Sequence, residues 1–410
     1  MPPHGERAPR ILHVDADAFF VAVARMVDPD GAGRAPLLIV GGSRESRGVV
    51  CSASYEARRF GVRSAMSIAR AVRLCPDAVC VPVPHKLCGV ESREIRAVLG
   101  RFTPVVEGAS IDEWYLDMGG TEAVYRHEPL RTTAHRIRDA VREGTGLSVS
   151  IGGGTNRLVA KLAVERAKPK PGTTADGVHV VAPGEEAAFL RTFTLAELPM
   201  VGPKFQERLA ARGMTTVPDV LRHDVATLRS WLGTRAADWL WDRVHGVGST
   251  TVEGRGEARS ISRDETFPVD LREDAELERE LLALVTRAAS DLRHSGMTAR
   301  TVTVKLRDAD FRTRSAQRTL DEPVVTDRVI MAVATALLAK LRSARRVPAR
   351  LIGVSLSSLA SDPKADQLPL FIESDPHRET ARDLALARVV DRVREKYGRK
   401  GIVPGSLVGD

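Results

Sequence analysis

The centre of this protein is expected where residues 110–117 (SIDEWYLD) meet residues 11–15 (ILHVD). Both stretches are typical of short strands that end in acidic residues. A half-buried strand alternates apolar and polar side chains, whereas Asp112 and Glu113 place two adjacent carboxylates before an apolar run. Two carboxylates about 4 Å apart repel each other by roughly 4 kcal/mol at an effective dielectric constant near 20. A cluster of these two acids with Asp15 therefore needs a cation.

Oxygen ligands of this kind favour magnesium when they lie at a site for phosphate groups. A divalent ion would offset the repulsion between the carboxylates. The alternative is that the three acids are separate strand-end and turn residues that never meet. The two strands alone do not decide between these alternatives.

The chain has 410 residues, enough for two to four domains that each bury a core. Its 61 Lys and Arg against 53 Asp and Glu give a formal net charge of +8, which favours a polyanionic partner. The cysteine spacings match no common zinc site. The N-terminus lacks the apolar run of a signal peptide, and no apolar segment reaches the length of a membrane span. We expect a cytoplasmic protein with no membrane partner.

The first half of the chain predicts a small sheet with helices on one side. Asp15 and Asp17 lie at a strand-to-helix turn, where Asp17 is the expected N-cap of the helix that follows. The expected strands are residues 10–14, 36–42, 48–53, 110–117 and 147–152, and the expected helices are residues 19–25, 55–60, 90–102, 132–144 and 157–166.

Three side chains on these helices can bind an anion. Tyr55 and Arg58 stand three residues apart on one helical face, so a phenol and a guanidinium can converge on one phosphate. Lys161 lies among the apolar residues of the last helix. The alternatives are a merely solvated Arg58 and a Lys161 that extends past its neighbours to water. Phe19 and Phe20 open the first helix, and both can be core residues.

Residues 198–222 predict a helix-hairpin-helix. Its hairpin amides and helix N-terminus, around Gly202 and Lys204, can hold a DNA phosphate without reading sequence. The alternative is an ordinary helical hairpin. Residues 246–256 are rich in Gly, Ser and Thr, and we expect them to be a linker between domains.

Beyond the linker, strands and helices alternate as in a second, split βαββαβ unit. Its strands carry many basic residues, and a sheet face of this charge suits a duplex backbone. The alternative is a face that is only solvated. The expected elements are strand 260–267, helix 274–294, strands 300–308 and 312–320, helix 326–341 and strand 350–356, and the basic residues are Arg300, Lys305, Arg307, Arg312, Arg314, Arg318 and Arg350.

Several motifs, taken in order, resemble those of the Y-family translesion DNA polymerases of the bacterial DNA polymerase IV (DinB) type. The resemblance extends from about Ile11 to Leu359. It rests on residues 13–20 (HVDADAFF), 53–63 (ASYEARRFGVR), 110–113 (SIDE), 160–163 (AKLA), 167–169 (AKP) and the hairpin at 201–202 (VG). Each motif could occur by chance, whereas the ordered set is specific.

The resemblance implies an α+β multidomain fold, that of a right-hand polymerase with a ferredoxin-like palm and small fingers. The thumb would carry the helix-hairpin-helix, and the little finger would be the βαββαβ unit. The implied domains are the palm (1–18 and 85–176), fingers (19–84), thumb (177–246), linker (247–256), little finger (257–359) and a tail (360–410).

The resemblance also implies the roles of individual residues in low-fidelity, template-dependent DNA synthesis past damaged bases. Asp15, Asp112 and Glu113, with the carbonyl oxygen of Ala16, would hold two magnesium ions for an in-line nucleotidyl transfer. Phe20 would be the steric gate that excludes a 2′-hydroxyl. The residues that would bind the dNTP triphosphate are Ser52, Tyr55, Arg58 and Lys161.

Primer-template DNA is the implied macromolecular partner. Gly202 and Lys204 of the thumb would contact its backbone. The little finger would add Arg300, Lys305, Arg307, Arg312, Arg314 and Arg318.

Residues 367–371 (QLPLF) resemble the peptide with which bacterial polymerases bind the sliding clamp. Leu368, Leu370 and Phe371 are apolar side chains in a polar tail, and Gln367 can hydrogen-bond at the rim of an apolar pocket. The alternative is that this segment packs onto the protein itself. We expect a nucleoid-associated monomer that binds the clamp, with a role still to be assigned to residues 372–410.

Four residues depart from the family pattern, and none of them removes a metal ligand. Cys88 stands where Tyr is usual, Ala24 where Glu is common, Trp114 where a small residue follows Asp-Glu, and Met200 where the hairpin has its first Gly. Two other functions compete. The intact acids argue against a catalytically silent scaffold bound to DNA, and a nucleotidyl cyclase would have no use for the hairpin or the basic sheet.

Overall fold

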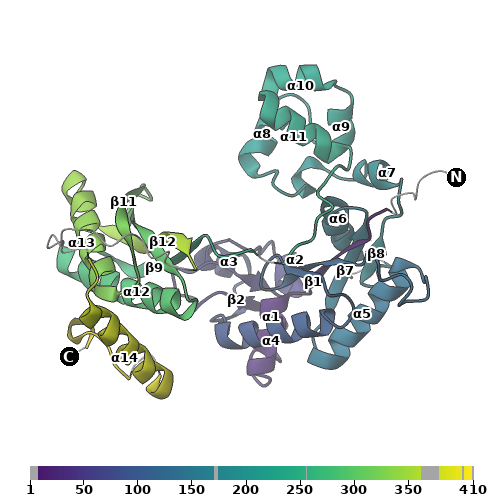
Figure 1. The fold of residues 1–410 in the computed structure, drawn as a ribbon. Coiled ribbons are helices and arrows are strands. Elements are labelled where there is room, and N and C mark those ends of the chain that lie inside the picture. The colour runs from purple at the N-terminus through teal and green to yellow at the C-terminus, as the bar shows by residue number, and fades with distance from the viewer. Residues whose placement is uncertain (1–7, 170–173, 255, 362–377, 399–400, 409–410) are drawn as a thin grey trace. The chain divides into compact units, whose positions relative to one another are not determined.

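The structure is a computed structural model that describes residues 8–169, 174–254, 256–361, 378–398 and 401–408. It divides into two compact units, one of residues 1–45 and 49–256 and one of residues 46–48 and 257–410. Both units combine sheets with helices (Figure 1).

The first unit is built on a five-stranded sheet in the order β5-β6-β1-β7-β8. Strand β1 lies at its centre and pairs antiparallel with both neighbours. All of its residues are buried except Asp15, which is half-buried. The strands are β1 (Ile11–Ala16), β5 (Val106–Gly108), β6 (Glu113–Asp117), β7 (Val149–Gly154) and β8 (Val178–Val180).

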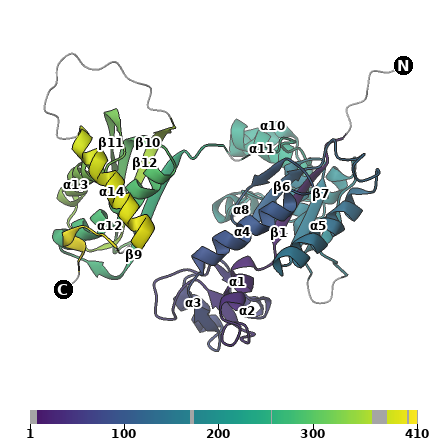
Figure 2. The ribbon, with the colours of Figure 1, turned by 60° about the horizontal axis from the view of Figure 1, so that its bottom comes forward.

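Helices cover both faces of this sheet (Figures 1 and 2). Leu12 and Val14 pack in one core with Trp114 and with α4 and α5. Because side chains alternate along a strand, His13 and Asp15 lie on the opposite face, which α6 covers. The prediction of helices on one side is therefore wrong. The helices are α4 (His85–Leu99), α5 (Leu130–Thr145) and α6 (Arg157–Ala167).

A three-stranded sheet in the order β3-β2-β4 is formed by the chain between β1 and α4. Ile39 of β2 packs in a small core with Ala57 and Ile68 from the helices α2 and α3. The elements of this part are α1 (Phe19–Val27), β2 (Leu38–Val40), β3 (Ser52–Ala53), α2 (Tyr55–Arg59), α3 (Ile68–Leu74) and β4 (Val79–Val81).

The chain after β8 is helical up to residue 244. Pro203 at the first position of α8 and the Thr216 capping box of α9 fix the starts of the two helices that the sequence predicts as a helix-hairpin-helix. Strand β8 lies past residue 177 but belongs to the five-stranded sheet. The elements are α7 (Glu186–Leu190), η1 (Leu195–Glu197), α8 (Pro203–Ala210), α9 (Val217–Leu221), α10 (Val225–Leu232) and α11 (Thr234–Val244).

The second unit is a four-stranded antiparallel sheet in the order β11-β10-β12-β9, with α12 and α13 on one face. Its chain order is the βαββαβ order that the sequence predicts. Val302, Val304 and Leu306 alternate along β10 and share one core with both helices. The elements are β9 (Ser260–Leu271), α12 (Asp274–His294), β10 (Thr298–Asp308), β11 (Thr313–Val324), α13 (Asp327–Ala344) and β12 (Ala349–Ala360).

A further helix, α14 (Ala381–Tyr397), is bound to the second unit mainly by ion pairs. Ala387 is its one buried residue. Arg293 of α12 donates to both carboxylate oxygens of Asp391, at 2.6 and 2.9 Å, and this pairing is partly screened from water. Arg328 of α13 binds Asp383 in the same two-pronged way, at 2.8 and 2.9 Å. The chain then turns through η2 (Gly405–Leu407).

The basic residues of the second sheet do not share one face. Lys305 and Arg307 alternate with the core residues of β10, so they lie on the open face. Arg314 pairs with the core residue Leu306, and Arg318 follows four residues on, so both lie on the helix-covered face. The open face carries mainly hydroxyl groups on these two strands, from Thr301, Thr303, Thr313, Ser315 and Thr319. The prediction of one basic face is therefore wrong.

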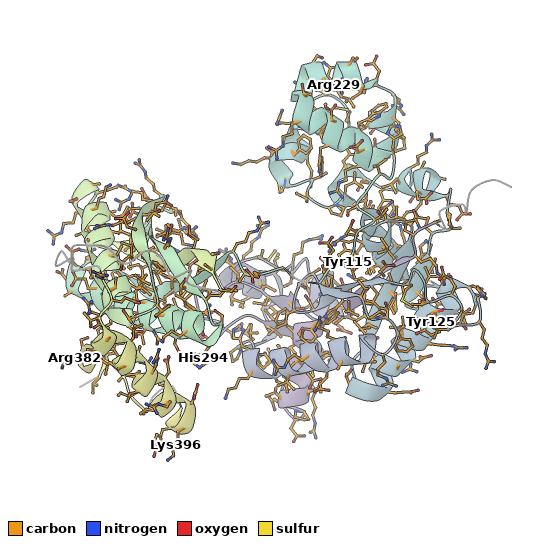
Figure 3. All side chains as sticks on the ribbon, viewed as in Figure 1. Tyr115, Tyr125, Arg229, His294, Arg382 and Lys396 are labelled. Atoms are coloured by element: carbon orange, nitrogen blue, oxygen red, sulfur yellow. The ribbon has the colours of Figure 1, made fainter. Side chains whose placement is uncertain are left out.

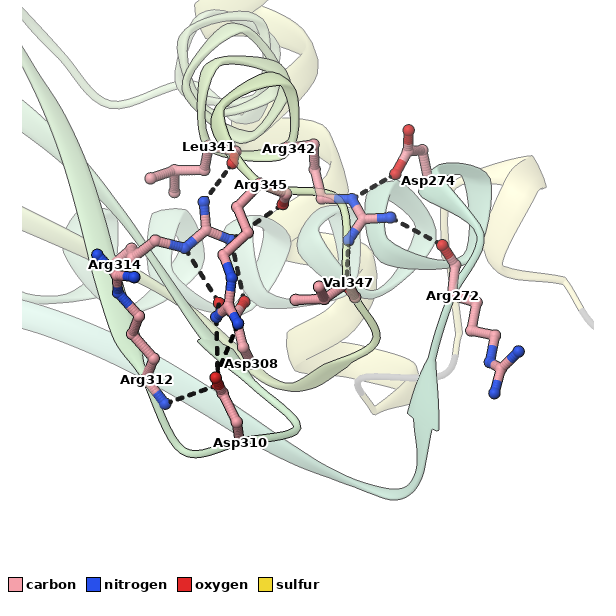
Figure 4. A network of polar contacts seen from close by, with 10 residues as sticks. All are labelled: Arg272, Asp274, Asp308, Asp310, Arg312, Arg314, Leu341, Arg342, Arg345 and Val347. Atoms are coloured by element: carbon pink, nitrogen blue, oxygen red, sulfur yellow. Dashed lines mark hydrogen bonds and ion pairs between the residues drawn. The ribbon is translucent and has the colours of Figure 1, made fainter.

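Arg314 belongs to a network of ion pairs at the turn between β10 and β11 (Figure 4). Asp308 is fully buried and pairs with Arg314 at 2.9 Å and with Arg345 at 2.6 Å. Arg345 also pairs with Asp310 at 2.8 Å. The side chain of Arg314 is 14% exposed, and its guanidinium also donates to the carbonyl of Leu341. The Arg314 guanidinium is thus used inside the unit.

Replacing Asp308 should destabilise the second unit strongly. Asp308→Ala leaves two guanidinium groups side by side without their shared counter-ion, which costs about 3 kcal/mol. The free energy of local opening is measured by hydrogen exchange of the β10 and β11 amides. The control is Asp264→Asn, which loses an ion pair with the half-exposed Lys305 and should cost less than about 1 kcal/mol. Equal losses in the two variants would contradict the structural role of Asp308.

Candidate active site

The backbones of three acids meet at one end of the central strands. Asp15 of β1 is opposite Glu113 of β6 in the antiparallel register. The backbone N–H of Ala16 donates to the carbonyl of Asp112 at 2.9 Å. Asp112 directly precedes β6, so only Glu113 of the acidic pair lies within the strand. Acids that the sequence places about a hundred residues apart are neighbours in the fold.

Helix α6 approaches these acids closely because Gly152 of β7 lies beneath it. A Cβ atom at Gly152 would be 2.1 Å from the carbonyl oxygen of Ala160 and 2.3 Å from the amide nitrogen of Val164. A larger residue would therefore push the helix away from the sheet. The close approach brings Lys161 of α6, and Lys168 directly after it, to the acidic face.

Each carboxylate of the acidic cluster has its own partner. Lys161 Nζ lies 2.6 Å from Glu113 Oε2, and Lys168 Nζ lies 3.1 Å from Asp15 Oδ2. The carboxylate of Asp112 accepts a hydrogen bond from the Ser110 hydroxyl. In the part of the chain that the structure describes, no three His, Cys, Asp or Glu side chains are gathered around one point as metal ligands. The lysines supply the positive charge that the sequence predicts at this place.

Two of the acids have opposite pKa shifts. Burial raises the pKa of Asp15 to about 6, against the opposing effect of Lys168. The His13 ring and the Lys161 ammonium lower the pKa of Glu113 to about 2. Lys161 has the stronger effect because it is in direct contact, whereas the nearest His13 nitrogen is 3.6 Å away. A poorly solvated carboxylate beside two others is a donor set that fits a hard divalent cation.

His13 and Lys168 are site residues to which the sequence gives no role. The His13 side chain is 1% exposed, and neither of its ring nitrogens has a hydrogen-bond partner within the described residues. Burial lowers the pKa of His13, so its ring is neutral, and it packs against the Tyr115 ring with centroids 4.5 Å apart. His13 could have been predicted as a site residue because it is a polar residue in an apolar strand. Lys168 could have been predicted from the motif at residues 167–169.

Asp17 is not the N-cap of α1, so that prediction is wrong. The cap position is Ala18, which has a left-handed backbone with φ 46° and makes no side-chain cap. Asp17 instead accepts hydrogen bonds from the hydroxyls of Ser148 and Ser150, at 2.9 and 2.7 Å. It fastens the turn after β1 to the neighbouring strand β7, which holds the end of the acidic strand in place.

The candidate triphosphate residues of the fingers lie on β3 and α2. Ser52 is buried, whereas Tyr55 and Arg58 are exposed. The Arg58 guanidinium lies 5.1 Å from the Tyr55 ring centroid, and its Nε donates to the carbonyl of Ala53 at 3.0 Å. Burial raises the pKa of Tyr55, and the negative charge of Asp17 adds to this shift. Tyr55 and Arg58 therefore share one face, as predicted from their spacing, and lie near the acidic turn.

The two phenylalanines at the start of α1 have different surroundings. Phe19 is fully buried in the core beneath the five-stranded sheet. Phe20 is only partly buried and meets the Phe19 ring edge-to-face, with centroids 5.5 Å apart. Phe19 is thus a core residue, whereas Phe20 keeps part of its surface available to a ligand.

A cavity of about 540 Å³ lies between the acidic strand and the helical region. Lys161 and Tyr115 line it from the sheet side, and Met200 and Arg243 line it from the helices. Met200 has φ 69° and is 80% exposed. Glycine adopts this left-handed conformation freely, so the methionine costs about 1 kcal/mol of backbone strain. Gly202 caps α8, and Lys204 lies in its first turn, both of them exposed.

Residues 246–253 of the stretch predicted as a linker are anchored to the first unit, which ends at residue 256. The backbone N–H of Arg157 donates to the carbonyl of Ser249 at 2.9 Å. The Arg157 guanidinium lies 4.1 Å from the ring centroid of Tyr115, which is labelled in Figure 3. Val252 is buried in a small core with Tyr115. This stretch therefore packs against Tyr115, which lies two residues after Glu113 on β6.

In the second unit Arg312 is exposed at the β10–β11 turn, Lys305 pairs with Asp264, and Arg300 and Arg318 lie on β10 and β11. The predicted clamp peptide, Gln367, Leu368, Leu370 and Phe371, lies outside the described residues. Within the described chain, no helix is both long enough and apolar enough to span a membrane.

Comparison with known sequences identifies the family. The model of the impB/mucB/samB family matches residues 14–165, and the model of its C-terminal domain matches residues 258–370. A DNA polymerase IV of Dehalococcoides mccartyi is 36% identical to this chain over 396 residues, which cover 97% of each protein. The chain belongs to the impB/mucB/samB family of Y-family DNA polymerases.

Solved structures agree with this assignment. A Y-family DNA polymerase chimera of Dbh and Dpo4 matches with a TM-score of 0.73 and 25% identity, over 86% of this chain and 100% of the chimera. An insertion ternary complex of Dbh DNA polymerase matches with a TM-score of 0.58 and 25% identity, over 85% of this chain and 98% of the other. Within the Y family the chain is of the DNA polymerase IV type, and membership implies dependence on a divalent metal.

Removing the Arg157 side chain should release the anchored stretch. Arg157 pairs with Glu107 at 2.5 and 2.7 Å, and Glu107 in turn accepts from the backbone N–H of Glu253 at 3.2 Å. Loss of charged hydrogen bonds worth about 1.5–3 kcal/mol predicts that Arg157→Ala speeds hydrogen exchange at residues 249–253 by about 10-fold or more. Arg166→Ala, on the same helix, is the control and should leave that exchange unchanged. Unaltered exchange in Arg157→Ala would show that the stretch is held by other contacts.

Proposed function

We propose that this protein is a template-dependent DNA polymerase of low fidelity that copies past damaged bases, using two magnesium ions at the acidic cluster. The observation that carries the proposal is the pairing of Asp15 with Glu113 on neighbouring strands, with Lys161 in contact. Three acids at one sheet end, with lysines within reach, are the arrangement that nucleotidyl transfer requires.

Asp15, Asp112 and Glu113 would hold the ions, with the carbonyl oxygen of Ala16 as a further ligand. Bound magnesium supplies Lewis-acid stabilisation of the charge that develops on the transferred phosphate. The buried His13 ring would keep Glu113 from turning away from Asp15, because it occupies the space beside the carboxylate. Burial of Asp15 also excludes water from one side of the site, which strengthens each electrostatic contact there.

The incoming dNTP would lie between α6 and the fingers. Lys161 lies beside Glu113, and its ammonium group would also contact a phosphate oxygen of the dNTP. Tyr55 and Arg58 present a hydroxyl and a guanidinium from one helical face, and Ser52 lies on the adjacent strand. Phe20 would lie under the sugar, where its ring leaves no room for a 2′-hydroxyl.

Primer-template DNA would be held by its backbone. In the first unit Gly202 and Lys204 present a helix start to a phosphate. The cavity beside Lys161 is lined by further cations and is large enough for part of a DNA strand. In the second unit we keep Arg300, Lys305, Arg307, Arg312 and Arg318 as candidate contacts.

The competing functions are less favoured. A silent DNA-bound scaffold would gain nothing from a buried Asp15 whose charge is costly. A nucleotidyl cyclase would not account for similarity to a DNA polymerase IV along 97% of the chain. We further propose that residues 367–371 bind the sliding clamp and that the protein works as a monomer on the nucleoid in the cytoplasm.

Replacing Asp112 should abolish DNA synthesis and spare DNA binding. Asp112→Asn keeps the shape of the side chain but removes charge from the metal site, so primer extension with magnesium should fall by at least about 100-fold, since each 1.4 kcal/mol is tenfold. Binding to primer-template is measured in parallel and should stay within about 2-fold. The matched control is Asp117→Asn at the far end of β6, for which we expect near-normal extension. Normal extension by Asp112→Asn would remove this acid from the site.

Replacing Phe20 should relax the choice of sugar. Phe20→Ala opens space for a 2′-hydroxyl, so the ratio of rNTP to dNTP incorporation should rise by at least about 10-fold while dNTP use is largely kept. Single-nucleotide insertion kinetics measure both substrates. Phe19→Leu is the control, because it alters the buried neighbour and should leave the ratio unchanged. An unchanged ratio in Phe20→Ala would mean that this ring only packs.

The clamp proposal is tested by the double variant Leu370→Ala, Phe371→Ala. Loss of two apolar anchors should weaken binding to the sliding clamp by at least about 100-fold, since buried anchors are worth about 2 kcal/mol or more each. Processivity on primed circular DNA should fall with it, whereas extension without clamp should be unchanged. Glu373→Gln, just outside the peptide, is the control. Clamp binding equal to that of wild type would exclude this peptide as the docking segment.

A further inference from the structure

The turn between β10 and β11 holds Phe311 in a conformation that aromatic residues rarely adopt. The backbone N–H of Phe311 donates to the carbonyl of Asp308, and that of Asp308 donates to the carbonyl of Arg312, both at 2.9 Å. These bonds define a three-residue hairpin loop whose last residue has a left-handed backbone, a place usually taken by glycine. Phe311 has φ 66° and is 63% exposed. Both the strain and the exposed ring are unfavourable for folding.

The turn beneath Phe311 is held by ion pairs and by a backbone hydrogen bond. Asp308 and Asp310 are both held by Arg345, as Figure 4 shows. The backbone N–H of Ala309 donates to the carbonyl of Pro348 at 2.9 Å, which ties the loop to the start of β12. Strained backbone of this kind persists only where the surrounding contacts fix it, and it is concentrated at functional sites. The ring is therefore displayed on a preorganised support.

One side of the Phe311 ring carries a cation. The Arg350 guanidinium lies 4.6 Å from the ring centroid. A guanidinium on one face leaves the opposite face of the ring for another flat group, and stacked arginine and aromatic side chains are a common platform for nucleic-acid bases.

The exposed charge around the turn is positive. Arg312 is exposed next to Phe311, whereas the Arg346 side chain, 72% exposed, pairs with Asp274 at 3.2 Å. The two acids of the turn do not offset the charge of Arg312, because Asp308 is buried and paired with two arginines and Asp310 is paired with Arg345. A polyanion with flat apolar faces is the partner that fits such a surface. In duplex DNA each base face is already covered by its neighbours, so only an unpaired nucleotide offers a free face.

We propose that this turn is a binding site for single-stranded DNA, in which Phe311 stacks on an unpaired base while Arg312 contacts the adjacent phosphate. The site goes beyond the proposed function, which gives the second unit backbone contacts only. It is defined by binding, so it can be tested without DNA synthesis.

The test compares Phe311→Leu with Phe311→Tyr in the full-length protein. Both variants keep a large side chain and the left-handed backbone, but only tyrosine keeps a ring that can stack. Fluorescence anisotropy measures binding to a labelled oligo(dT) single strand and to a blunt duplex of equal length at fixed salt. Phe311→Leu should lose about 5- to 100-fold in single-strand affinity, the range found for one base–aromatic stack, with duplex affinity unchanged. Phe311→Tyr should stay within about 2-fold of wild type on both.

Salt dependence separates the ring from the cations. Arg312→Ala should lower the slope of log K against log salt for the single strand by about 0.7, because one phosphate contact is lost. Phe311→Leu should leave that slope unchanged, because stacking releases no counter-ions.

Three results would overturn the site. The first is a Phe311→Leu variant with unchanged affinity for the single strand, and the second is an equal loss of its affinity for duplex. The third is a melting temperature of Phe311→Leu so far below that of Phe311→Tyr that unfolding explains the lost binding. The last result would mean that the ring serves only to cover Arg350. A protein that fails to extend primers but still shows the predicted difference would overturn the proposed function and support the stacking site.

Discussion

Electrostatic repulsion among acids at the end of the central strands is the constraint on which the first unit depends. Asp15 and Glu113 lie opposite each other in a buried sheet, where water cannot separate their charges. Lys161 on α6 and Lys168 directly after it offset this repulsion, because they pair with Glu113 and Asp15. Gly152 makes that possible, because only a residue without a side chain lets α6 pack so close to β7.

The same contacts explain why the site is suited to phosphate chemistry. Burial disfavours the charged form of Asp15 and raises its pKa to about 6, and the Lys168 ammonium opposes this shift. Each lysine that neutralises an acid is also within reach of a ligand that carries negative charge. Contacts outside the acidic cluster stabilise this geometry. Asp17 binds the turn after β1 to β7, and Arg157 holds the stretch after α11 against Tyr115.

The second unit handles charge in two ways. Asp308 gathers Arg314 and Arg345 into a buried network that shapes the β10–β11 turn. The cations that remain at the surface, such as Arg312, are free to contact a polyanion. Buried ion pairs of this kind define a local conformation more than they add stability, and here the conformation they define is the one that displays Phe311.

The sequence by itself determined the fold class and the βαββαβ order, because apolar periodicity is a local pattern, whereas the acidic strand ends left open whether the three acids meet. It could not place α6 on the second face of the sheet, since that depends on a close approach at Gly152. It misjudged Asp17 as a cap, because the partners of that side chain, Ser148 and Ser150, are distant in the chain. Only the tertiary structure decided which charges are used inside the protein and which remain for a ligand.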